Sequence, residues 1–441
     1  MTRTGVLLAP ARRTPFAALL SAYVVSMLGT SMSELAVPWL VLTTTGSAGK
    51  TGLVAFAQML PYVMMQALAG PVVDRVGLRR SYVWGNLTAA VAVGAVPLMY
   101  ATGALSLGVL IGLVAVAGAV RGAGDCANMA LVPATARAGQ VPLERAAGLN
   151  ASANRTALLL GAPIAGVLVT VTNAATVVLI DAITFAVAAI VVAAGVRGID
   201  PDARSASPDV DEPAAVRDAP GVLRRYGRDL ADGLRFLGRD RLLLGIVAMV
   251  AVTNLLDQGL SAVLLPVWVR EQLHSAAALG VLGGAMGLGS VIGNLAGAWL
   301  GPRVSRRGLY SVGNLVGGAP RFLIVAIAST LSPVLAVSFA AEIFSGSLNP
   351  VIGATSYERI PPHMQARVLG VIRASAWVGI PFGALFAGVL ADATNVRLAI
   401  AISGAAYLLT TLAPFVFPTW RQMRRPDPVD ADTERRTPAT A

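Results

Sequence analysis

The dominant feature of the sequence is a series of long apolar stretches separated by short segments rich in arginine. An apolar helix needs about 20 residues to cross the hydrocarbon core of a bilayer, whereas the strands of a membrane barrel alternate apolar and polar residues over about ten positions. The stretches have the helical length and no such alternation. We therefore predict an all-α polytopic membrane protein with twelve transmembrane helices, at 15–42, 51–72, 81–101, 105–132, 147–171, 175–196, 242–268, 278–301, 309–330, 333–355, 368–390 and 397–419.

The first stretch is expected to remain in the protein as helix 1. It is about twice as long as the apolar part of a signal sequence, it contains Glu34, and no small-residue cleavage pattern follows it.

The composition agrees with a membrane protein and excludes several kinds of chemistry. Hydrophobic residues make up 55% of the chain and charged residues only 13%, against about 25% charged residues in soluble domains. The two histidines and the single cysteine, Cys126, supply neither a metal-ligand cluster nor a disulfide. We expect no metal and no other cofactor.

The net charge of +11 comes from 33 arginines and one lysine, and their positions argue against nucleic-acid binding because they lie between the apolar stretches. With the amino terminus placed inside, the inner segments hold 27 arginines, whereas the outer loops hold only Lys50, Arg270 and Arg397. Positive residues favour the cytoplasmic side. We therefore expect both termini to be cytoplasmic, in a multi-pass protein of the cell (inner or plasma) membrane.

The segment between helices 6 and 7 divides the chain into two halves. It begins with a mixture of Pro, Ala and Asp that cannot form a core. Its end predicts a basic amphipathic helix on the inner leaflet, with a solvated loop as the alternative; the apolar face would hold Leu223, Tyr226, Leu230, Leu234 and Leu237. The predicted organisation is an amino-terminal segment (1–14), a six-helix bundle (15–196), the cytoplasmic loop (197–241), a second six-helix bundle (242–419) and a disordered tail (420–441).

The two halves share residues at nearly constant offsets, which indicates a duplicated six-helix unit. An offset of 227 residues relates the regions after helices 2 and 8. An offset of 228 relates the ends of helices 1 and 7, and an offset of 218 relates helices 5 and 11. The matched pairs are Gly70 and Gly297, Arg79 and Arg306, Arg80 and Arg307, Pro38 and Pro266, Arg155 and Arg373, and Pro163 and Pro381.

The loop after helix 2 reads GPVVDRVGLRR and resembles the signature loop of the major facilitator superfamily, Gly-x-x-x-Asp-Arg-x-Gly-x-Arg-Arg. The family often has arginine where this chain has Leu78, so Arg79 or Arg80 would have to act instead. Three further stretches resemble the drug:proton antiporters that include macrolide efflux pumps and siderophore exporters: ELAVPWLVLTTTGSAGKTGLVAFAQMLPYVMMQALAG, PLERAAGLNASANR and GLRFLGRDRLL. The matching loop residues are Gly70, Asp74, Arg75, Gly77, Arg79 and Arg80.

The resemblance implies an inner gate at this loop. Gly70 lacks a side chain and would let helix 2 approach helix 11 closely. Asp74 and Arg373 are expected to pair when the transporter opens outward, and Asp125 would then bind Arg79 or Arg80. In the second half, Gly301 occupies the acidic position, so only arginines remain there.

Helix 5 contains LLLGAPIAGVL, which is similar to the antiporter pattern Gly-Pro-x-x-Gly-Gly. Gly161, Pro163 and Gly166 match it, although Ala162 separates the first two. Small residues and a proline permit close packing and bending in a moving helix. General small-residue packing explains the pattern equally well.

Nine charged residues lie at membrane depth, where each costs about 2.5–3.5 kcal/mol unless it faces a cavity or a partner. Helices 5, 6, 9 and 11 carry Arg155, Asp181, Arg321 and Arg373. The resemblance implies that helices 1, 4, 7 and 10 line the central cavity, and these carry the remaining five: Glu34, Arg121, Asp125, Asp257 and Glu342. Arg121 and Asp125 are four residues apart on one helix face, so they can also simply neutralise each other.

A carboxylate that couples transport to protons must be reached from both sides and must exchange a proton near neutral pH. Asp257 lies near the middle of helix 7 and is the first candidate; Glu34, nearer the outer side, is the second. We expect Arg321 on the neighbouring helix to hold Glu342 ionised, which favours a substrate-binding or structural role for Glu342.

The leading hypothesis is a secondary active transporter that exports amphipathic drugs or antibiotics in exchange for protons by alternating access, and not an enzyme. No ATP-binding loop is present, and a single lysine in an outer loop could not complete one. The alternatives are a dedicated exporter of a siderophore or other metabolite, and a scramblase or sensor without proton coupling. The expected partners of this monomer are its substrate, protons and lipid, with apolar contacts from Phe56, Met59, Met64 and Met65.

The predicted topology can be tested with single cysteines in a Cys126→Ala background. A cysteine at Ser106 should react with a membrane-impermeant maleimide in intact cells, and one at Asp209 should react only after the membrane is opened. The reverse labelling pattern would contradict the predicted orientation.

Overall fold

The structure is a computed structural model that describes residues 14–196, 231–301, 303–361 and 364–423. All regular elements in these ranges are helices. Twelve helical spans are long and apolar enough to cross a membrane. The predicted all-α class and the number of spans are therefore confirmed.

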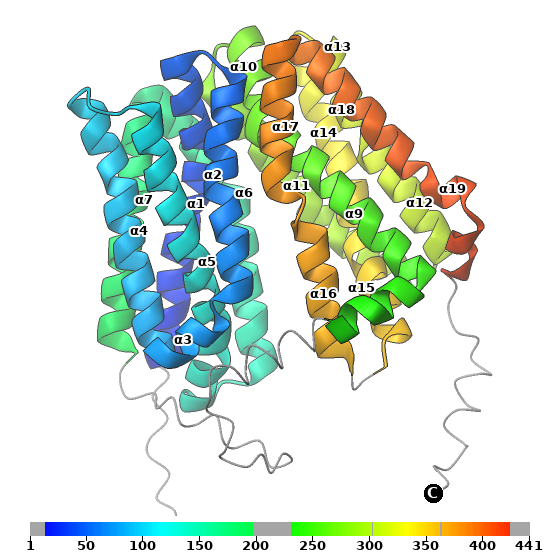
Figure 1. Ribbon diagram of the computed structural model, residues 1–441, viewed down its shortest axis with the longest axis horizontal. Helices are drawn as coiled ribbons and strands as arrows, with labels where there is room; N and C mark the ends of the chain where they lie inside the picture. Colours follow the sequence, from blue (N-terminus) through cyan, green and yellow to red (C-terminus); the bar gives the residue numbers. More distant parts are fainter. Residues whose placement is uncertain (1–13, 197–230, 302, 362–363, 424–441) are drawn as a thin grey trace, which may run out of the picture.

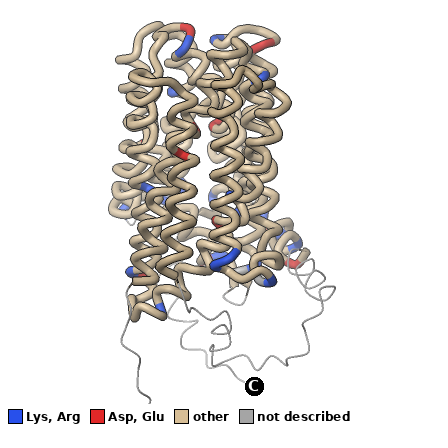
Figure 2. Tube along the Cα trace, turned by 90° about the vertical axis from the view of Figure 1, so that its left-hand side faces the viewer, with Lys and Arg blue, Asp and Glu red and all other residues tan. Residues whose placement is uncertain are grey.

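The first six spans form one bundle and the last six form a second bundle beside it (Figure 1). Charged residues gather mainly at the two ends of the molecule (Figure 2). The first bundle consists of α1 (Thr14–Thr45), α2 (Ala48–Leu68), α4 (Leu78–Ala101), α5 (Leu107–Ala138), α6 (Leu143–Val171) and α7 (Ala174–Gly195), with the short α3 (Gly70–Val76) after α2.

Most spans of the second bundle are built from more than one helix. Span 8 alone is continuous, as α11 (Ala276–Leu300). The composite spans are α9 (Arg241–Gly259), η2 (Leu260–Leu264) and α10 (Leu265–Gln272); α12 (Arg306–Gly317) and α13 (Ala319–Ile327); α14 (Leu331–Gly346) and α15 (Leu348–Arg359); α16 (Gln365–Trp377) and α17 (Ile380–Ala393); and α18 (Val396–Thr411), α19 (Ala413–Val416) and the 3₁₀ turn η4 (Pro418–Gln422).

Proline and glycine explain where these spans break. Proline lacks the N–H group that an α-helix uses and clashes with the preceding turn. Pro320 and Pro381 each lie at the start of a new helix, and the π-helical turn η2 comes just before Pro266. At Gly318, a β-carbon would lie 1.7 Å from the ring of Tyr407, so a larger residue does not fit there. The break between α12 and α13 places Arg321 in the first turn of α13.

The two halves repeat each other in local detail beyond the residues noticed in the sequence. The side-chain amide of Asn86 donates to the carbonyl of Tyr82 at 2.8 Å, and Asn314 donates to Tyr310 at the same distance. Asn173 caps the start of α7 by accepting from Thr176, and Asn395 caps α18 by accepting from Leu398. These matching hydrogen bonds support the duplicated six-helix unit.

The predicted amphipathic helix is partly described. Leu223, Tyr226 and Leu230 lie outside the described residues, and residues 231–239 are helical. In that helix Leu234 is exposed, whereas Leu237 is buried against Val368 and Val371. The described turns therefore pack on α16, and the expectation that the whole apolar face meets lipid is wrong for Leu237.

Asp240 fixes the entry into the second bundle. Its carboxylate accepts hydrogen bonds from the N–H groups of Leu242 and Leu243 and from the Nε of Arg359 at 2.7 Å. Burial alone would raise the pKa of Asp240, but these hydrogen bonds outweigh it and hold the pKa below its usual range. The side chain therefore stays ionised and caps α9.

Candidate functional site

A cavity of 330 Å³ lies between the two halves. It is lined by α1, α2 and α6 on one side and by α9, η2, α10 and α11 on the other. Its wall is mostly apolar, which is typical of small-molecule sites with a few orienting polar groups. The polar side chains in the wall are Ser31, Glu34, Thr51, Gln58, Gln258 and Ser261.

The repeat brings equivalent parts of both halves to this cavity. Pro38 and Pro266, which are 228 residues apart, both line it. On the second side, the π-helical turn η2 places Ser261 in the wall. Such turns are rare and occur frequently at functional sites.

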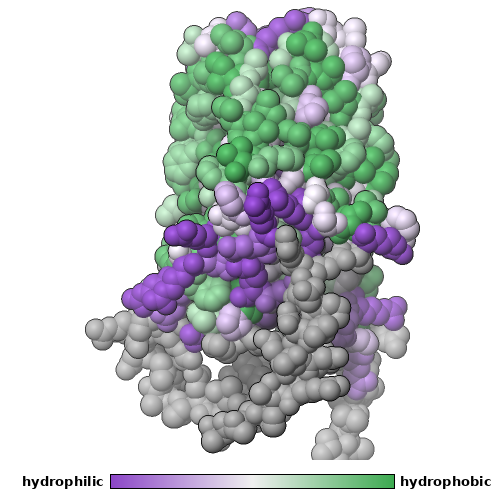
Figure 3. Space-filling view, turned by 90° about the vertical axis from the view of Figure 1, so that its right-hand side faces the viewer, coloured by the Kyte–Doolittle hydropathy of each residue, from purple (hydrophilic) through white to green (hydrophobic). Residues whose placement is uncertain are grey.

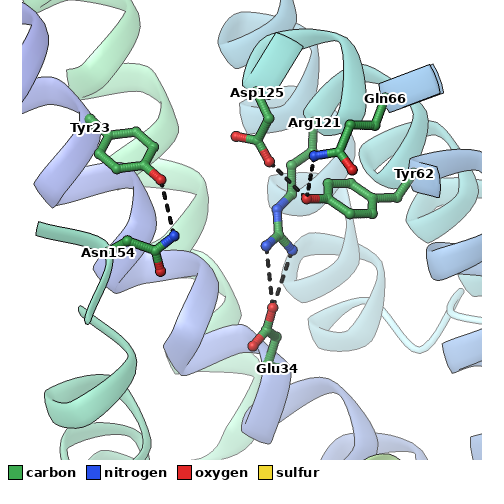
Figure 4. Close-up of polar contacts among 7 residues, drawn as sticks. All are labelled: Tyr23, Glu34, Tyr62, Gln66, Arg121, Asp125 and Asn154. Atoms are coloured by element: carbon green, nitrogen blue, oxygen red, sulfur yellow. Dashed lines mark hydrogen bonds and ion pairs between the residues drawn. The ribbon is translucent and has the colours of Figure 1, made fainter. Parts of the chain in front are cut away.

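Glu34 is the acidic side chain in the cavity wall, and it pairs with Arg121. Both terminal nitrogens of Arg121 lie 3.3 Å from one oxygen of Glu34 (Figure 4). The Glu34 side chain keeps 37% of its surface exposed, whereas Arg121 keeps 13%. The carboxylate therefore stays accessible to a molecule in the cavity while the arginine holds it from behind.

Asp125 lies close to this pair but binds a different partner (Figure 4). The Tyr62 hydroxyl donates to Asp125 at 3.0 Å and accepts from the amide of Gln66 at 3.3 Å. The Arg121 guanidinium lies over the Tyr62 ring, 4.9 Å from its centre. Arg121 therefore donates its hydrogen bonds to Glu34 on another helix. It does not donate to Asp125, as the alternative of neutralisation within α5 would require.

The second half contains a cluster of one arginine and two acids. Arg321 donates to Glu342 at 2.6 Å and also to Asp257. The arginine is almost fully buried, while the side chain of Asp257 remains 33% exposed. The expected contact between Arg321 and Glu342 is present. The same guanidinium also binds Asp257. Pairing with Arg321 therefore does not distinguish Glu342 from Asp257, contrary to our expectation.

Tyr62, Gln58 and Gln258 were not predicted as site residues. Each is an uncharged polar residue inside an apolar stretch, which is a weaker signal than a charge at membrane depth. Of the four apolar residues proposed as substrate contacts, Met59 lines the cavity. Phe56 instead contacts Phe382 of the other half, with ring centres 5.5 Å apart. The other two, Met64 and Met65, do not line the described cavity.

The signature loop forms α3 and the start of α4. Gly77 joins them with a φ of 93°, a left-handed conformation that favours glycine. Arg79 donates to the carbonyl of Ala193, and Arg75 and Arg80 are exposed. The side chain of Asp74 lies outside the described residues, so its expected pairing with the exposed Arg373 stays a prediction.

At the end of the molecule that carries this loop, the halves stand apart. Figure 1 shows α3 and α16 on separate sides. A β-carbon on Gly70 would meet no atom within 4 Å. In this conformation, Gly70 therefore does not provide the close approach of helices 2 and 11 that we expected.

The close approach of these helices occurs at the opposite end. A β-carbon on Gly52 of α2 would lie 2.3 Å from the carbonyl oxygen of Ala384 on α17. Nearby, Asp392 of α17 accepts from the hydroxyl of Ser47 at 2.7 Å and from the N–H of Ala48 at 3.0 Å. A residue of one half thus caps the first turn of a helix in the other half.

The residues of the antiporter-like pattern in α6 form a second contact at this end. Gly161 packs against Ser31 of α1, and Pro163 packs against Gly284 of α11. A β-carbon on Gly166 would lie 2.8 Å from the α-carbon of Gly280. Gly161 thus packs within the first half, whereas Pro163 and Gly166 contact the second half, Gly166 through direct backbone contact.

Two six-helix halves around a shared cavity, joined at one end and separated at the other, define a membrane transporter of the alternating-access class. The model of the Major Facilitator Superfamily matches residues 19–256 and again residues 247–440. The chain belongs to this family, and it is a transporter and not an enzyme.

Among curated proteins, it is similar to the multidrug efflux pump Tap of Mycobacterium tuberculosis, with 28% identity over 95% of this chain and 97% of the relative. The Tap pump of Mycolicibacterium fortuitum is 25% identical over 92% and 96%.

Solved structures of the same fold include the nucleoside transporter NupG, with a TM-score of 0.71 and 11% identity over 91% of this chain and 99% of that chain. A bacterial homolog of the human lysosomal transporter Spinster, in an inward-facing and occupied conformation, gives a TM-score of 0.71 and 12% identity over 95% and 100%. At this identity, the likeness shows the fold alone.

The contact at Gly166 leads to a test of the closed end. Gly166→Val should open it, because overpacking costs about 1–3 kcal/mol and thereby lowers the closed population at least about fivefold. Spin labels on cysteines at Ala104 and Thr330, in a Cys126→Ala background, would report a longer distance. Gly112→Val is the control, since Gly112 is exposed with no atom within 4 Å of an added β-carbon. An equal distance change in both variants would contradict the role of the α6–α11 contact.

Proposed function

We propose that this protein exports amphipathic, preferentially cationic small molecules in exchange for protons. The observation that carries the proposal is the apolar cavity between the halves with the accessible carboxylate of Glu34 in its wall. Leucine, valine and methionine side chains suit a lipophilic body, and Glu34 suits a positive charge. The relatives named multidrug efflux pumps support the direction of transport.

The proposal includes an orientation. We place the arginine-rich end, with both termini and the central loop, in the cytoplasm, since the count of basic residues favours it. The conformation described above is then open to the cytoplasm and closed outside. In that state, a substrate would enter from the cytoplasm or inner leaflet.

Two charge clusters support proton coupling. Each cluster combines two carboxyl groups with one arginine. The first half has Glu34, Asp125 and Arg121, and the second half has Asp257, Glu342 and Arg321. With both acids ionised, each cluster has a net charge of −1, so the uptake of one proton or one cation makes it neutral. We assign proton transfer first to Asp257, whose side chain is 33% exposed, with Glu342 sharing its arginine.

Glu34 is our second candidate for the proton and the first for binding a cationic substrate. It lies in the cavity wall, whereas Asp257 and Glu342 lie outside the described lining. A division of roles follows in which substrate charge is met in the first half and the proton in the second.

Export and coupling can be tested together in proteoliposomes with an imposed pH gradient and ethidium as the substrate. Wild-type protein should move ethidium uphill. Asp257→Asn should reduce uphill movement to background while downhill exchange of ethidium persists, because a permanently neutral side chain carries no proton. Glu271→Gln is a control at an exposed acid at the end of the same span.

The outcomes separate the assignments. Loss of downhill exchange in Glu34→Gln with intact protein would support its role in substrate binding. Uphill movement by Asp257→Asn together with its loss in Glu34→Gln would move proton coupling to α1. An absence of ethidium movement and of any proton flux in the wild type would contradict the proposed function with this substrate class.

We also propose that Asp74 and Arg373 pair in the outward-open state, where α3 and α16 would meet. A pair at a partly wet surface contributes about 0–1 kcal/mol, which is enough to bias a conformational equilibrium up to about fivefold. Asp74→Asn should therefore impair export with normal membrane insertion. The double variant Asp74→Arg/Arg373→Asp should recover part of it.

Asp232→Asn is the control for this gate, because Asp232 lies at the same end and pairs with the exposed Arg235 of its own helix. Full export activity in Asp74→Asn would remove the pair from the transport cycle.

A further inference from the structure

A second large hollow lies on the outer face of the second bundle, away from the transport cavity. It has a volume of 790 Å³ and is formed by the α11–α12 connection, the start of α12, α19 and η4. We call it the arginine groove, because none of the described residues that line it is acidic and four are arginines: Arg303, Arg306, Arg307 and Arg421.

Three of these arginines are held in place by neighbouring groups. Arg303 donates to the carbonyl of Trp299 and lies over its ring, 4.2 Å from the centre. Arg307 donates to the carbonyl of Pro414 at 3.0 Å. Arg306 forms an ion pair with Glu358. A carbonyl partner positions a guanidinium without neutralising it, so Arg303 and Arg307 keep their charge and further N–H donors for an anion.

The internal repeat explains why this positive charge remains. Arg306 and Arg307 correspond to Arg79 and Arg80 of the signature loop in the first half. That loop also contains an aspartate, whereas the second half has glycine at the equivalent position, Gly301. The second copy of the loop therefore has the arginines without the acid.

The groove adjoins apolar surface. Val312 and Phe415 line it and are each 47% exposed, and Val416 next to them is 68% exposed. Trp299, whose ring lies under the guanidinium of Arg303, is 63% exposed. Figure 3 shows hydrophilic side chains directly bordering the apolar band on this face. A ligand that fits both parts has an anionic head and a hydrocarbon tail.

We propose that the arginine groove binds the phosphate headgroup of an anionic phospholipid, with its acyl chains along Val312 and Phe415. Guanidinium groups bind phosphate oxygens through paired N–H donors, and basic pockets on the cytoplasmic side of membrane proteins suit anionic headgroups. The site is independent of what the transporter carries. Its occupancy anchors the second bundle to one leaflet.

The test titrates phosphatidylglycerol and phosphatidylcholine into delipidated full-length protein and measures retained lipid by native mass spectrometry. Wild-type protein should prefer phosphatidylglycerol. Arg303→Gln/Arg421→Gln should weaken its binding about fivefold for each arginine removed. Arg421→Lys should retain most of the affinity, because it keeps the charge. The matched control is Arg137→Gln/Arg145→Gln, two exposed arginines at the same end of the first bundle.

A tryptophan measurement locates the lipid. Brominated phosphatidylglycerol in phosphatidylcholine vesicles should quench wild-type fluorescence more than it quenches Trp299→Phe. No preference for phosphatidylglycerol in the wild type, or equal losses in the groove and control variants, would overturn the proposal. Displacement of the lipid by inorganic phosphate at equal concentration would also overturn it, since it would indicate a site for a free phosphate.

Discussion

The backbone contact between the two halves at the closed end is the constraint on which the rest of the structure depends. Gly52 meets Ala384, and Gly166 meets Gly280, at distances that leave no room for a side chain. Glycine contacts bring helices together over a small area without interlocking large side chains. Such a contact excludes solvent when it is formed, yet few interdigitated groups must separate when it opens. A transporter that alternates between two openings needs this combination.

The buried charges follow from the same constraint. Arg121 binds Glu34 within the first half, and Arg321 binds Asp257 and Glu342 within the second. Breaking a buried ion pair by separating its partners costs about 3–5 kcal/mol, so a pair that crossed between halves would resist their motion. Among the described residues, Asp392 accepts hydrogen bonds from Ser47 and Ala48 across the halves, and this contact lies at the rim where water can replace it. Strong electrostatics therefore stay inside each rigid half.

Much of the fold could be predicted from the sequence, because apolar length alone determines where a helix spans a membrane. The charged residues of the cavity helices were also found, since charge at membrane depth is conspicuous. Among their partners, the pairing of Arg321 with Glu342 was expected, but that of Arg321 with Asp257 was not. Arg321 reaches Asp257 because the chain breaks at Gly318 and restarts at Pro320, and no periodicity shows where a side chain points after such a break. For the same reason, the contact of Asp392 with α2, more than 300 residues away in sequence, required the fold.

The two repeats differ at one acidic position, and we propose that this difference gives the halves unequal tasks. In the first half, the loop after span 2 has Asp74 beside its arginines and lies at the end where the two halves stand apart. In the second half, Gly301 replaces the acid, and the arginines face the periphery, where Arg307 is fixed by Pro414. A charge pair that forms and breaks requires opposite signs on moving surfaces, whereas an anchor to the membrane requires one sign on a fixed surface. In this proposal, a single carboxylate, which the first loop has and the second lacks, separates a gate element from an anchoring element, so that the first half would rock against a second half held by its leaflet.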